Sequence, residues 1–281
     1  MSLPEPSSLA QLLALMAKLR DPHGGCPWDR AQTFATLAPY TLEEAYEVVD
    51  AIESGESPAR LCDELGDLLF QVVFYAQLGK ERGWFDFDSI ARGIHDKLVR
   101  RHPHVFGDTS GVDTPDQVLH AWEEHKAAER AAAGESGRAG VLEGVPRALP
   151  ALKRAQKLGK RAARVGFDWT DMRDVRAKIT EELSELDEAA HEARGQHSSG
   201  AAPEHVVEEM GDLLFAIANW GRHVGADAET ALRGANAKFE RRFASMEALA
   251  RERDLTLKAL SLDAWEALWQ EAKQAERAST G

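Results

Sequence analysis

The chain has 281 residues, enough for two domains of ordinary size, and it is 43% hydrophobic and 29% charged. Its 34 basic residues (Lys and Arg) against 47 acidic residues leave a formal net charge of −13, which argues against a protein that binds DNA, RNA or an anionic membrane through a basic face. Two cysteines without a Cys-x-x-Cys motif, no signal-peptide pattern and no apolar run of about 18 residues predict a cytoplasmic protein that does not span a membrane.

Helical periodicity dominates the chain from its N-terminal end. The first apolar stripe has spacings of three and four and consists of Leu9, Leu12, Leu13, Met16 and Leu19. Similar stripes follow over residues 65–76 and 210–218, and no segment alternates apolar and polar residues as a half-buried strand does. The sequence therefore predicts an all-α fold.

Paired carboxylates follow the first stripe. Residues 42–47 read LEEAYE and residues 64–70 read ELGDLLF. They supply one Glu-x-x-Glu pair and one Glu-x-x-Asp pair: Glu44, Glu47, Glu64 and Asp67. Residues three apart share a helix face, so each pair can point the same way from one of two neighbouring helices. The plainer alternatives are a solvated helix surface and, for residues 41–44, a capping box at a helix start.

The second half of the chain repeats this order. EELSE at 181–185 and EMGDLLF at 209–215 supply the second set of acids: Glu182, Glu185, Glu209 and Asp212. A Lys-x-x-x-Arg pair and a Trp-x-x-x-Lys pair then follow in each half: Lys97 and Arg101 with Trp122 and Lys126, then Lys238 and Arg242 with Trp269 and Lys273. Four elements in one order indicate a duplicated helical unit of roughly 120 residues. The expected division is an N-terminal unit (1–135), a linker (136–150) and a C-terminal unit (151–281).

Four acids on a shared face repel one another unless a cation lies between them. Oxygen ligands alone favour Mg²⁺, with Mn²⁺ as the alternative. A di-iron bundle would need Glu-x-x-His, but the residue three after Glu64 and Glu209 is Asp in both halves. The pair His102 and His104 is a weaker zinc candidate without a cysteine partner. Gly66 and Gly211 lie between the acids of the Glu-x-x-Asp pairs and predict the close approach of another helix there.

Basic and aromatic residues near the ends of the two repeats suit a nucleotide. Lys238 and Arg242 lie four apart and can offer a point charge and a planar fork to phosphate oxygens. Trp122 and Trp269 can stack on a base. Taken singly, each pair is more often an ordinary pair on a helix surface, and each tryptophan is more often a core residue.

These motifs together resemble the MazG family of nucleoside triphosphate pyrophosphohydrolases, over about residues 9–275. The strings that carry the resemblance are GCPWD at 25–29, TLEEAYEV at 41–48, RRHPHVF at 100–106, VGFDW at 165–169 and NAKFERRF at 236–243. The resemblance implies tandem helical bundles of the all-α NTP pyrophosphatase type that form a homodimer. It also implies Mg²⁺-dependent hydrolysis of (deoxy)nucleoside triphosphates to the monophosphate and pyrophosphate.

The resemblance assigns the activity to the C-terminal unit. Carried over by motif, it implies metal ligation by Glu182, Glu185, Glu209 and Asp212. It implies nucleotide contacts by Lys178, Glu181, Glu208, Asp212, Lys238, Arg242 and Trp269. Either Glu181 or Glu182 is expected to orient or deprotonate the attacking water.

The N-terminal unit departs from the family pattern. Its acids Glu44, Glu47, Glu64 and Asp67 form a second candidate metal site. Tyr40 stands where the C-terminal unit has Lys178, and His95 stands where it has Asn236. We therefore expect the N-terminal unit to be mainly structural and dimer-forming, with weak or absent turnover.

Two other functions stay open. One is a narrower pyrophosphohydrolase for dUTP, phosphoribosyl-ATP or oxidised nucleotides, which needs a base-specific polar pocket. The other is a non-catalytic, dimeric, metal-binding helical scaffold, which would bind Mg²⁺ without turnover. The cations Lys178, Lys238 and Arg242 argue against the scaffold, because a scaffold needs no side chains that bind phosphate.

Overall fold

The structure is a computed structural model that describes residues 7–55, 57–107, 114, 117–118, 140–194 and 202–279. All regular elements among these residues are helical, which confirms the all-α prediction. The chain divides into two compact units, Met1–Gly134 and Glu135–Gly281. Of the expected linker, residues 140–150 form turns, and residues 136–139 lie outside the described part of the chain.

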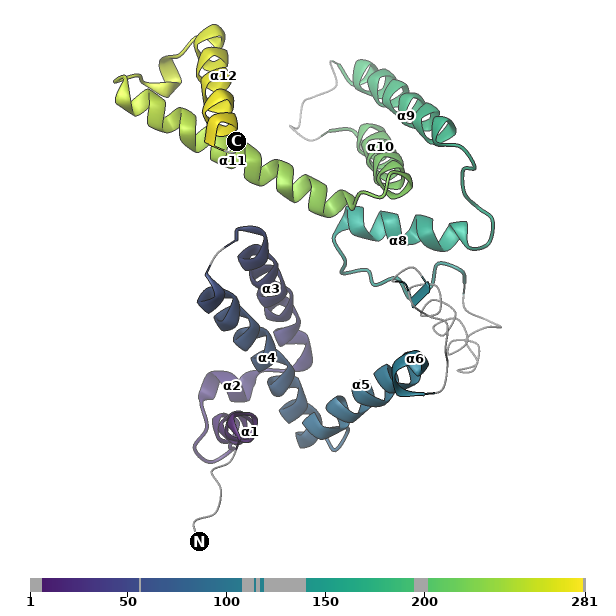
Figure 1. The fold of residues 1–281 in the computed structure, drawn as a ribbon, viewed down its shortest axis with the longest axis vertical. Helices are drawn as coiled ribbons and strands as arrows, with labels where there is room; N and C mark the ends of the chain where they lie inside the picture. Colours follow the sequence, from purple (N-terminus) through teal and green to yellow (C-terminus); the bar gives the residue numbers. More distant parts are fainter. Residues whose placement is uncertain are drawn as a thin grey trace. The chain divides into compact units, whose positions relative to one another are not determined.

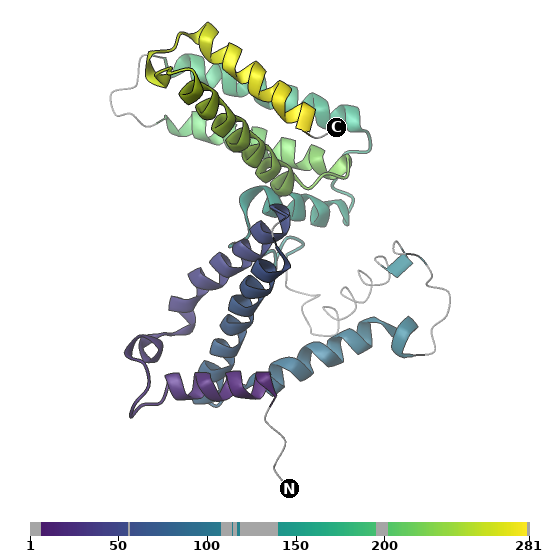
Figure 2. The same ribbon diagram turned by 60° about the vertical axis from the view of Figure 1, so that its left-hand side comes forward.

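The first unit is built around one long antiparallel helix pair. Its helices are α1 (Ser8–Leu19), α2 (Pro27–Ala31), α3 (Phe34–Glu53), α4 (Pro58–Glu81), α5 (Phe87–Arg101) and α6 (Pro103–Phe106). Helices α3 and α4 run side by side, and α1 packs against α4 (Figures 1 and 2). Their contact buries one apolar cluster, made of Met16, Leu37, Val73, Phe74 and Leu78. This cluster fixes the register in which α3 and α4 present their acids.

Helix α3 begins earlier than its acidic motif. The side chain of Thr33 accepts a hydrogen bond from the Thr36 backbone, and Thr36 reciprocates, which completes a capping box at that end. The alternative interpretation of residues 41–44 as a capping box is therefore wrong, because Thr41 lies inside the helix. Its hydroxyl bonds the carbonyl oxygen of Leu37 (3.2 Å) and the Tyr75 hydroxyl on α4 (2.7 Å).

A buried arginine ties three helices of the first unit together. Arg20, directly after α1, donates to both carboxylate oxygens of Glu81 on α4, each at 2.7 Å, and also to the carbonyl oxygen of Asp29 on α2. Its guanidinium lies 5.5 Å from the centre of the Phe74 ring. The Arg20 side chain is 8% exposed, so this bidentate pair is largely shielded from water.

Replacing Arg20 with Met is expected to lower the free energy of unfolding of the first unit by about 2 kcal/mol, because Glu81 would lose its partner in a partly buried setting. The Arg20 hydrogen bonds lower the pKa of Glu81 below its ordinary 4.5. Their stabilisation is therefore present above about pH 4.5 and is lost as the pH falls through the lowered pKa. Urea unfolding at neutral and acid pH measures both effects.

The matched control for this prediction is Lys18→Met. Lys18 pairs with Asp21 at 3.0 Å, but its side chain is 72% exposed. Exposed pairs contribute little, so this variant should stay within about 0.5 kcal/mol of the unaltered chain. Equal losses in the two variants would contradict the assigned role of Arg20.

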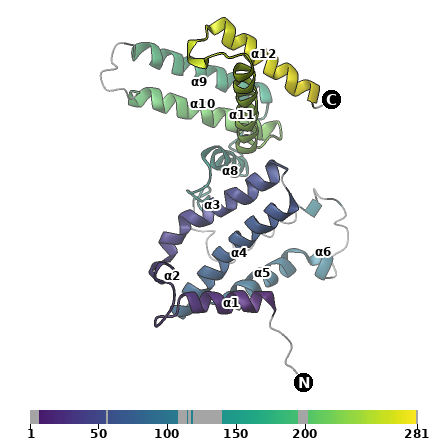
Figure 3. The same ribbon diagram turned by 90° about the vertical axis from the view of Figure 1, so that its left-hand side faces the viewer.

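The second unit repeats the helix pair and adds a hairpin. Its elements are α8 (Ala151–Ala163), α9 (Met172–Glu192), α10 (Glu204–His223), α11 (Ala228–Glu252), the 3-10 turn η2 (Leu257–Ala259) and α12 (Leu262–Ser279). Helices α9 and α10 run side by side, and α8 packs on α10 (Figure 3). Helices α11 and α12 form a hairpin that diverges from α9 and α10 (Figure 1). The hairpin has its own buried cluster, made of Met246, Ala250, Leu268 and Ala272.

The start of α11 is held by polar contacts from α8. The amide of Gln156 donates to the carbonyl oxygens of Ala218 (3.0 Å) and Ala226 (2.8 Å), and its oxygen accepts from the Ala228 backbone (3.2 Å). Lys153 forms an ion pair with Asp227, the residue that caps α11. These contacts set the direction in which the hairpin leaves the rest of the unit.

The two units carry the duplicated motifs in the same helix order. The acids lie on α3 and α4 in the first unit and on α9 and α10 in the second, and the Lys-x-x-x-Arg pairs lie on α5 and α11. Trp269 lies on α12, whereas Trp122 and Lys126 lie outside the described residues. The shared order supports tandem duplication of one helical unit.

The two motif glycines are open to solvent. A Cβ atom added at Gly66 or Gly211 would meet no atom within 4 Å. Within the part of the chain that the structure describes, no other helix approaches either glycine closely, so the prediction is wrong there. The neighbouring apolar residues are exposed as well, namely Leu65, Leu69, Met210 and Leu214.

Candidate metal and nucleotide site

Three carboxylates of the second unit converge between α9 and α10. Oxygen atoms of Glu182, Glu185 and Glu209 all lie within 4.8 Å of one another. Glu182 and Glu185 are three residues apart on α9, and the packing of α10 brings Glu209 opposite them. Glu182 is buried, so its charge depends on partners inside the protein.

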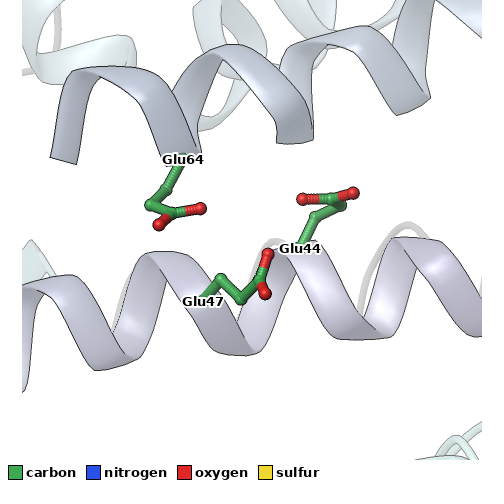
Figure 4. A group of neighbouring side chains, drawn as sticks. All are labelled: Glu44, Glu47 and Glu64. Carbon is green, nitrogen blue, oxygen red and sulfur yellow. The ribbon is translucent and has the colours of Figure 1, made fainter. Parts of the chain in front are cut away.

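The first unit holds the equivalent group. Oxygen atoms of Glu44 and Glu47 on α3 and of Glu64 on α4 also lie within 4.8 Å of one another. Figure 4 shows the three carboxylates pointing into the space between the two helices. The structure thus brings together three of the four predicted acids in each unit.

The fourth predicted acid of each unit, Asp67 or Asp212, lies outside the group of three carboxylates. Asp67 is exposed but close enough for its charge to raise the pKa of Glu44. Asp212 and Glu208 are exposed on α10. Among the described residues, neither aspartate belongs to the tight group of three. Since an exposed side chain can rotate, both aspartates remain candidates as outer ligands.

The electrostatics of both groups favour a bound cation. Burial raises the pKa of Glu44 above its ordinary 4.5, and Asp67 and Glu47 raise it further. Partial loss of hydration and the charge of Glu182 raise the pKa of the exposed Glu185, against the opposing charge of Lys178. Such repulsion between hard oxygen ligands fits Mg²⁺ or Mn²⁺ better than a redox metal or zinc.

The raised pKa values predict how stability depends on pH without metal. The folded chain holds protons on Glu44 and Glu185 at pH values where the unfolded chain has released them, so stability should fall as the pH rises above the ordinary pKa of 4.5 and through the raised values. Thermal unfolding in EDTA measures this slope, and Glu44→Gln with Glu185→Gln should flatten it. Mg²⁺ should raise Tm more at the higher pH. A Tm gain from Mg²⁺ that is the same at both pH values would contradict this account.

Lys178 is the counter-ion of the second group. Its ammonium lies 2.8 Å from Glu181 and 2.7 Å from Glu182, and these hydrogen bonds raise the pKa of Lys178 above its ordinary value. In the first unit Arg60 instead lies 3.3 Å from Glu64. Arg60 is not among the predicted site residues, although its position four residues before Glu64 is the usual spacing of a helical ion pair.

The other predicted nucleotide contacts lie on the hairpin. Arg242 bonds Glu276 of α12 at 2.6 Å, and its guanidinium lies 5.7 Å from the centre of the Trp269 ring. Trp269 packs against the hairpin cluster, and Lys238 is exposed on α11. The hairpin that carries these three side chains diverges from α9 and α10, which carry the acids (Figure 1).

The histidine pair shows no metal-binding geometry. The ring centres of His102 and His104 lie 5.6 Å apart, and Nδ1 of His102 lies 2.7 Å from the carbonyl oxygen of Leu98. Neither belongs to a group of three or more metal-binding side chains within the described residues. No helix in the described ranges has both the length and the apolar content needed to cross a bilayer.

Known proteins share this sequence along nearly all of its length. The model of the MazG nucleotide pyrophosphohydrolase domain matches residues 32–106. A nucleoside triphosphate pyrophosphohydrolase of Escherichia coli strain K12 is 51% identical over 270 residues, which cover 96% of this chain and 98% of that protein. The nucleoside triphosphate pyrophosphohydrolase/pyrophosphatase MazG of Thermotoga maritima is 41% identical over 263 residues, 94% of each chain. The uncharacterized protein YabN of Bacillus subtilis is 42% identical over 95% of this chain and 52% of its own length.

Proposed function

The chain belongs to the MazG family of nucleotide pyrophosphohydrolases, and on that basis we propose that its second unit is the catalytic one, with Mg²⁺ held by Glu182, Glu185 and Glu209. The chain is a nucleoside triphosphate pyrophosphohydrolase, which converts its substrate to a nucleoside monophosphate and pyrophosphate. The observation that supports this proposal is the convergence of three carboxylates beside Lys178. In the first unit Tyr40 stands at the position of Lys178, and the cation near the acids is Arg60 on the other helix.

The chemistry divides between the metal and the side chains. Bound Mg²⁺ supplies charge stabilisation on the phosphates and lowers the pKa of a coordinated water. Lys178 lies one helical turn from Glu182, so its ammonium can neutralise a phosphate oxygen near the ligand acids. Exposed Glu181 would turn from its ion pair with Lys178 towards the attacking water and accept its proton. The water oxygen bonds to phosphorus as the α–β anhydride bond breaks, and no covalent enzyme intermediate is required.

A homodimer would bring the acids of one chain together with the hairpin residues of the other. Helix α10 exposes a row of apolar side chains, namely Val207, Met210, Leu214 and Phe215. Gly211 in the middle of this row leaves room for a partner helix. A second copy seated on this face would cover the apolar row, and its hairpin would bring Arg242 and Trp269 to the acids.

The first unit is proposed to be mainly structural and dimer-forming. Helix α4 repeats the exposed face of α10, with Leu65 and Leu69 on either side of Gly66. Its acids are present, but Tyr40 offers no cation to a phosphate. Turnover there is expected to be weak or absent. A cytoplasmic location, as the sequence predicts, would give the enzyme access to its nucleotide substrates.

Substrate range separates the remaining alternatives. Pyrophosphate release should be measured with Mg²⁺ on canonical, deoxy and oxidised nucleoside triphosphates, on dUTP and on phosphoribosyl-ATP. Release from many of them would support a general pyrophosphohydrolase, and release from one damaged nucleotide would make the enzyme a specialised cleaner of the nucleotide pool. Metal binding without release from any nucleotide would favour the non-catalytic scaffold and overturn the proposed site.

A further inference from the structure

The guanidinium of Arg242 is held from one side. Its Nε atom donates to Oε2 of Glu276 on α12 at 2.6 Å, and its central carbon lies 5.7 Å from the centre of the Trp269 ring. Within the described part of the chain, the terminal nitrogens Nη1 and Nη2 donate no hydrogen bond. A guanidinium carries five N–H donors in one plane, so a single bond through Nε leaves its four terminal donors for a ligand.

Helix α12 fixes the position of Glu276 beside this guanidinium. Glu276 lies seven residues after Trp269, which is close to two helical turns, so the two side chains share one face of α12. Trp269 packs against the buried cluster of the hairpin, which holds that face against α11. The second carboxylate oxygen of Glu276 accepts a hydrogen bond from Arg241 at 3.2 Å. The Arg242 bond lowers the pKa of Glu276 below its ordinary 4.5, so this carboxylate is charged at neutral pH.

The same pair of residue types recurs in the first repeat. The string WQEAKQAER at 269–277 matches WEEHKAAER at 122–130, which aligns Glu276 with Glu129. Alignment of AKFERRF with DKLVRRH likewise matches the arginine with Arg101. Glu129 lies outside the described residues, so this support comes from the sequence alone. The arginine and the glutamate therefore both belong to the duplicated unit, together with the tryptophan beside them.

We propose that Glu276 is a positioning residue, which holds Arg242 against Trp269 so that Nη1 and Nη2 face the phosphates of a bound nucleotide. Glu276 acts through the arginine and contacts no nucleotide atom. The proposal rests on the proposed function, which assigns Arg242 to a phosphate. A guanidinium that is already fixed loses little side-chain freedom when the nucleotide binds, whereas ordering a mobile arginine would lower the affinity.

The test compares Glu276→Ala, Arg242→Ala and the double variant in the full chain with Mg²⁺. Calorimetry with α,β-methylene-ATP measures binding without turnover. Glu276→Ala should weaken binding by about tenfold, because the nucleotide must then order the side chain of Arg242. In the Arg242→Ala chain the same change should alter the affinity by less than about twofold, since Glu276 acts only through the arginine. A glutamate with a merely structural role would cause a similar loss in both chains.

Two further variants separate the position of the arginine from the stability of the hairpin. Glu276→Gln keeps an oxygen that can accept from Nε of Arg242, so this variant should bind within about threefold of the unaltered chain. Glu271→Ala breaks the ion pair between Arg253 of the hairpin and α12, and it should leave binding unchanged. That pair has no counterpart in the first repeat, because no lysine or arginine occurs between residues 102 and 122.

Four results would each overturn the proposal: a Glu276→Ala loss that persists without Arg242, an equal loss in Glu271→Ala, tighter binding by Glu276→Ala, or no binding by the unaltered chain. Pyrophosphate release from ATP, measured in parallel, decides the proposed function separately. A chain that binds the analogue but releases no pyrophosphate would refute that function and leave the role of Glu276 standing.

Discussion

The Glu185→Gln variant is expected to lose pyrophosphate release by at least about 100-fold, while its far-ultraviolet circular dichroism stays unchanged. The substitution keeps the shape of the side chain but removes one of three converging charges. Glu185 is exposed, so the fold does not depend on it. Steady-state kinetics on a nucleoside triphosphate in saturating Mg²⁺ would show the loss in kcat, and Mn²⁺ titration would show weaker metal binding.

The duplicated chain provides a matched control for this variant. Glu47 occupies the equivalent place in the first unit and belongs to the equivalent group of carboxylates. Glu47→Gln is expected to retain most of the turnover, because catalysis is assigned to the second unit. Loss of most turnover in a folded Glu47→Gln protein would reverse that assignment, and comparable losses in both variants would mean that both units contribute.

The Leu214→Asp variant is expected to become monomeric and to lose about 100-fold in kcat/KM. Leu214 is exposed on α10, three residues after Gly211, so in the proposed dimer a charge there would be buried against the second copy without a partner. The monomer would keep its acids but could not receive Arg242 and Trp269 from the other hairpin. Sedimentation velocity and steady-state kinetics measure the two effects on one sample.

A second exposed leucine tests whether this effect is specific to α10. Leu262 at the start of α12 is the more exposed of the two, at 87% against 44%. Leu262→Asp should leave both the mass in solution and the turnover close to those of the unaltered chain. A monomeric Leu214→Asp protein with full activity would show that one chain completes its own site.

Local spacing explains what could be predicted from the sequence. The pairs Glu44 with Glu47 and Glu182 with Glu185 follow from helical periodicity, and their convergence with an acid of the next helix is confirmed. Lys178 could be placed beside Glu182 for the same reason, since the two lie four residues apart. Such contacts need only the geometry of one helix or of two consecutive ones.

Contacts between distant segments could not be predicted in this way. Arg242 was expected at a phosphate, but its partner in one chain is Glu276, 34 residues away, which no short motif reveals. The capping box at residues 41–44 failed because a better one exists at Thr33 and Thr36.

The fixed start of α11 makes the position of residues farther along the hairpin sensitive to small rotations of the helix. Arg242 lies 14 residues beyond Ala228, which corresponds to roughly 21 Å along the helix axis. A rotation of only about 10° at the anchored end would move the guanidinium by about 4 Å, more than the length of a hydrogen bond. The contacts of Gln156 and Lys153 at the start of α11 therefore determine where the guanidinium of Arg242 lies, although neither residue contacts Arg242 itself. Substitutions at Gln156 or Lys153 would therefore change the position of Arg242 without altering any residue of the proposed site.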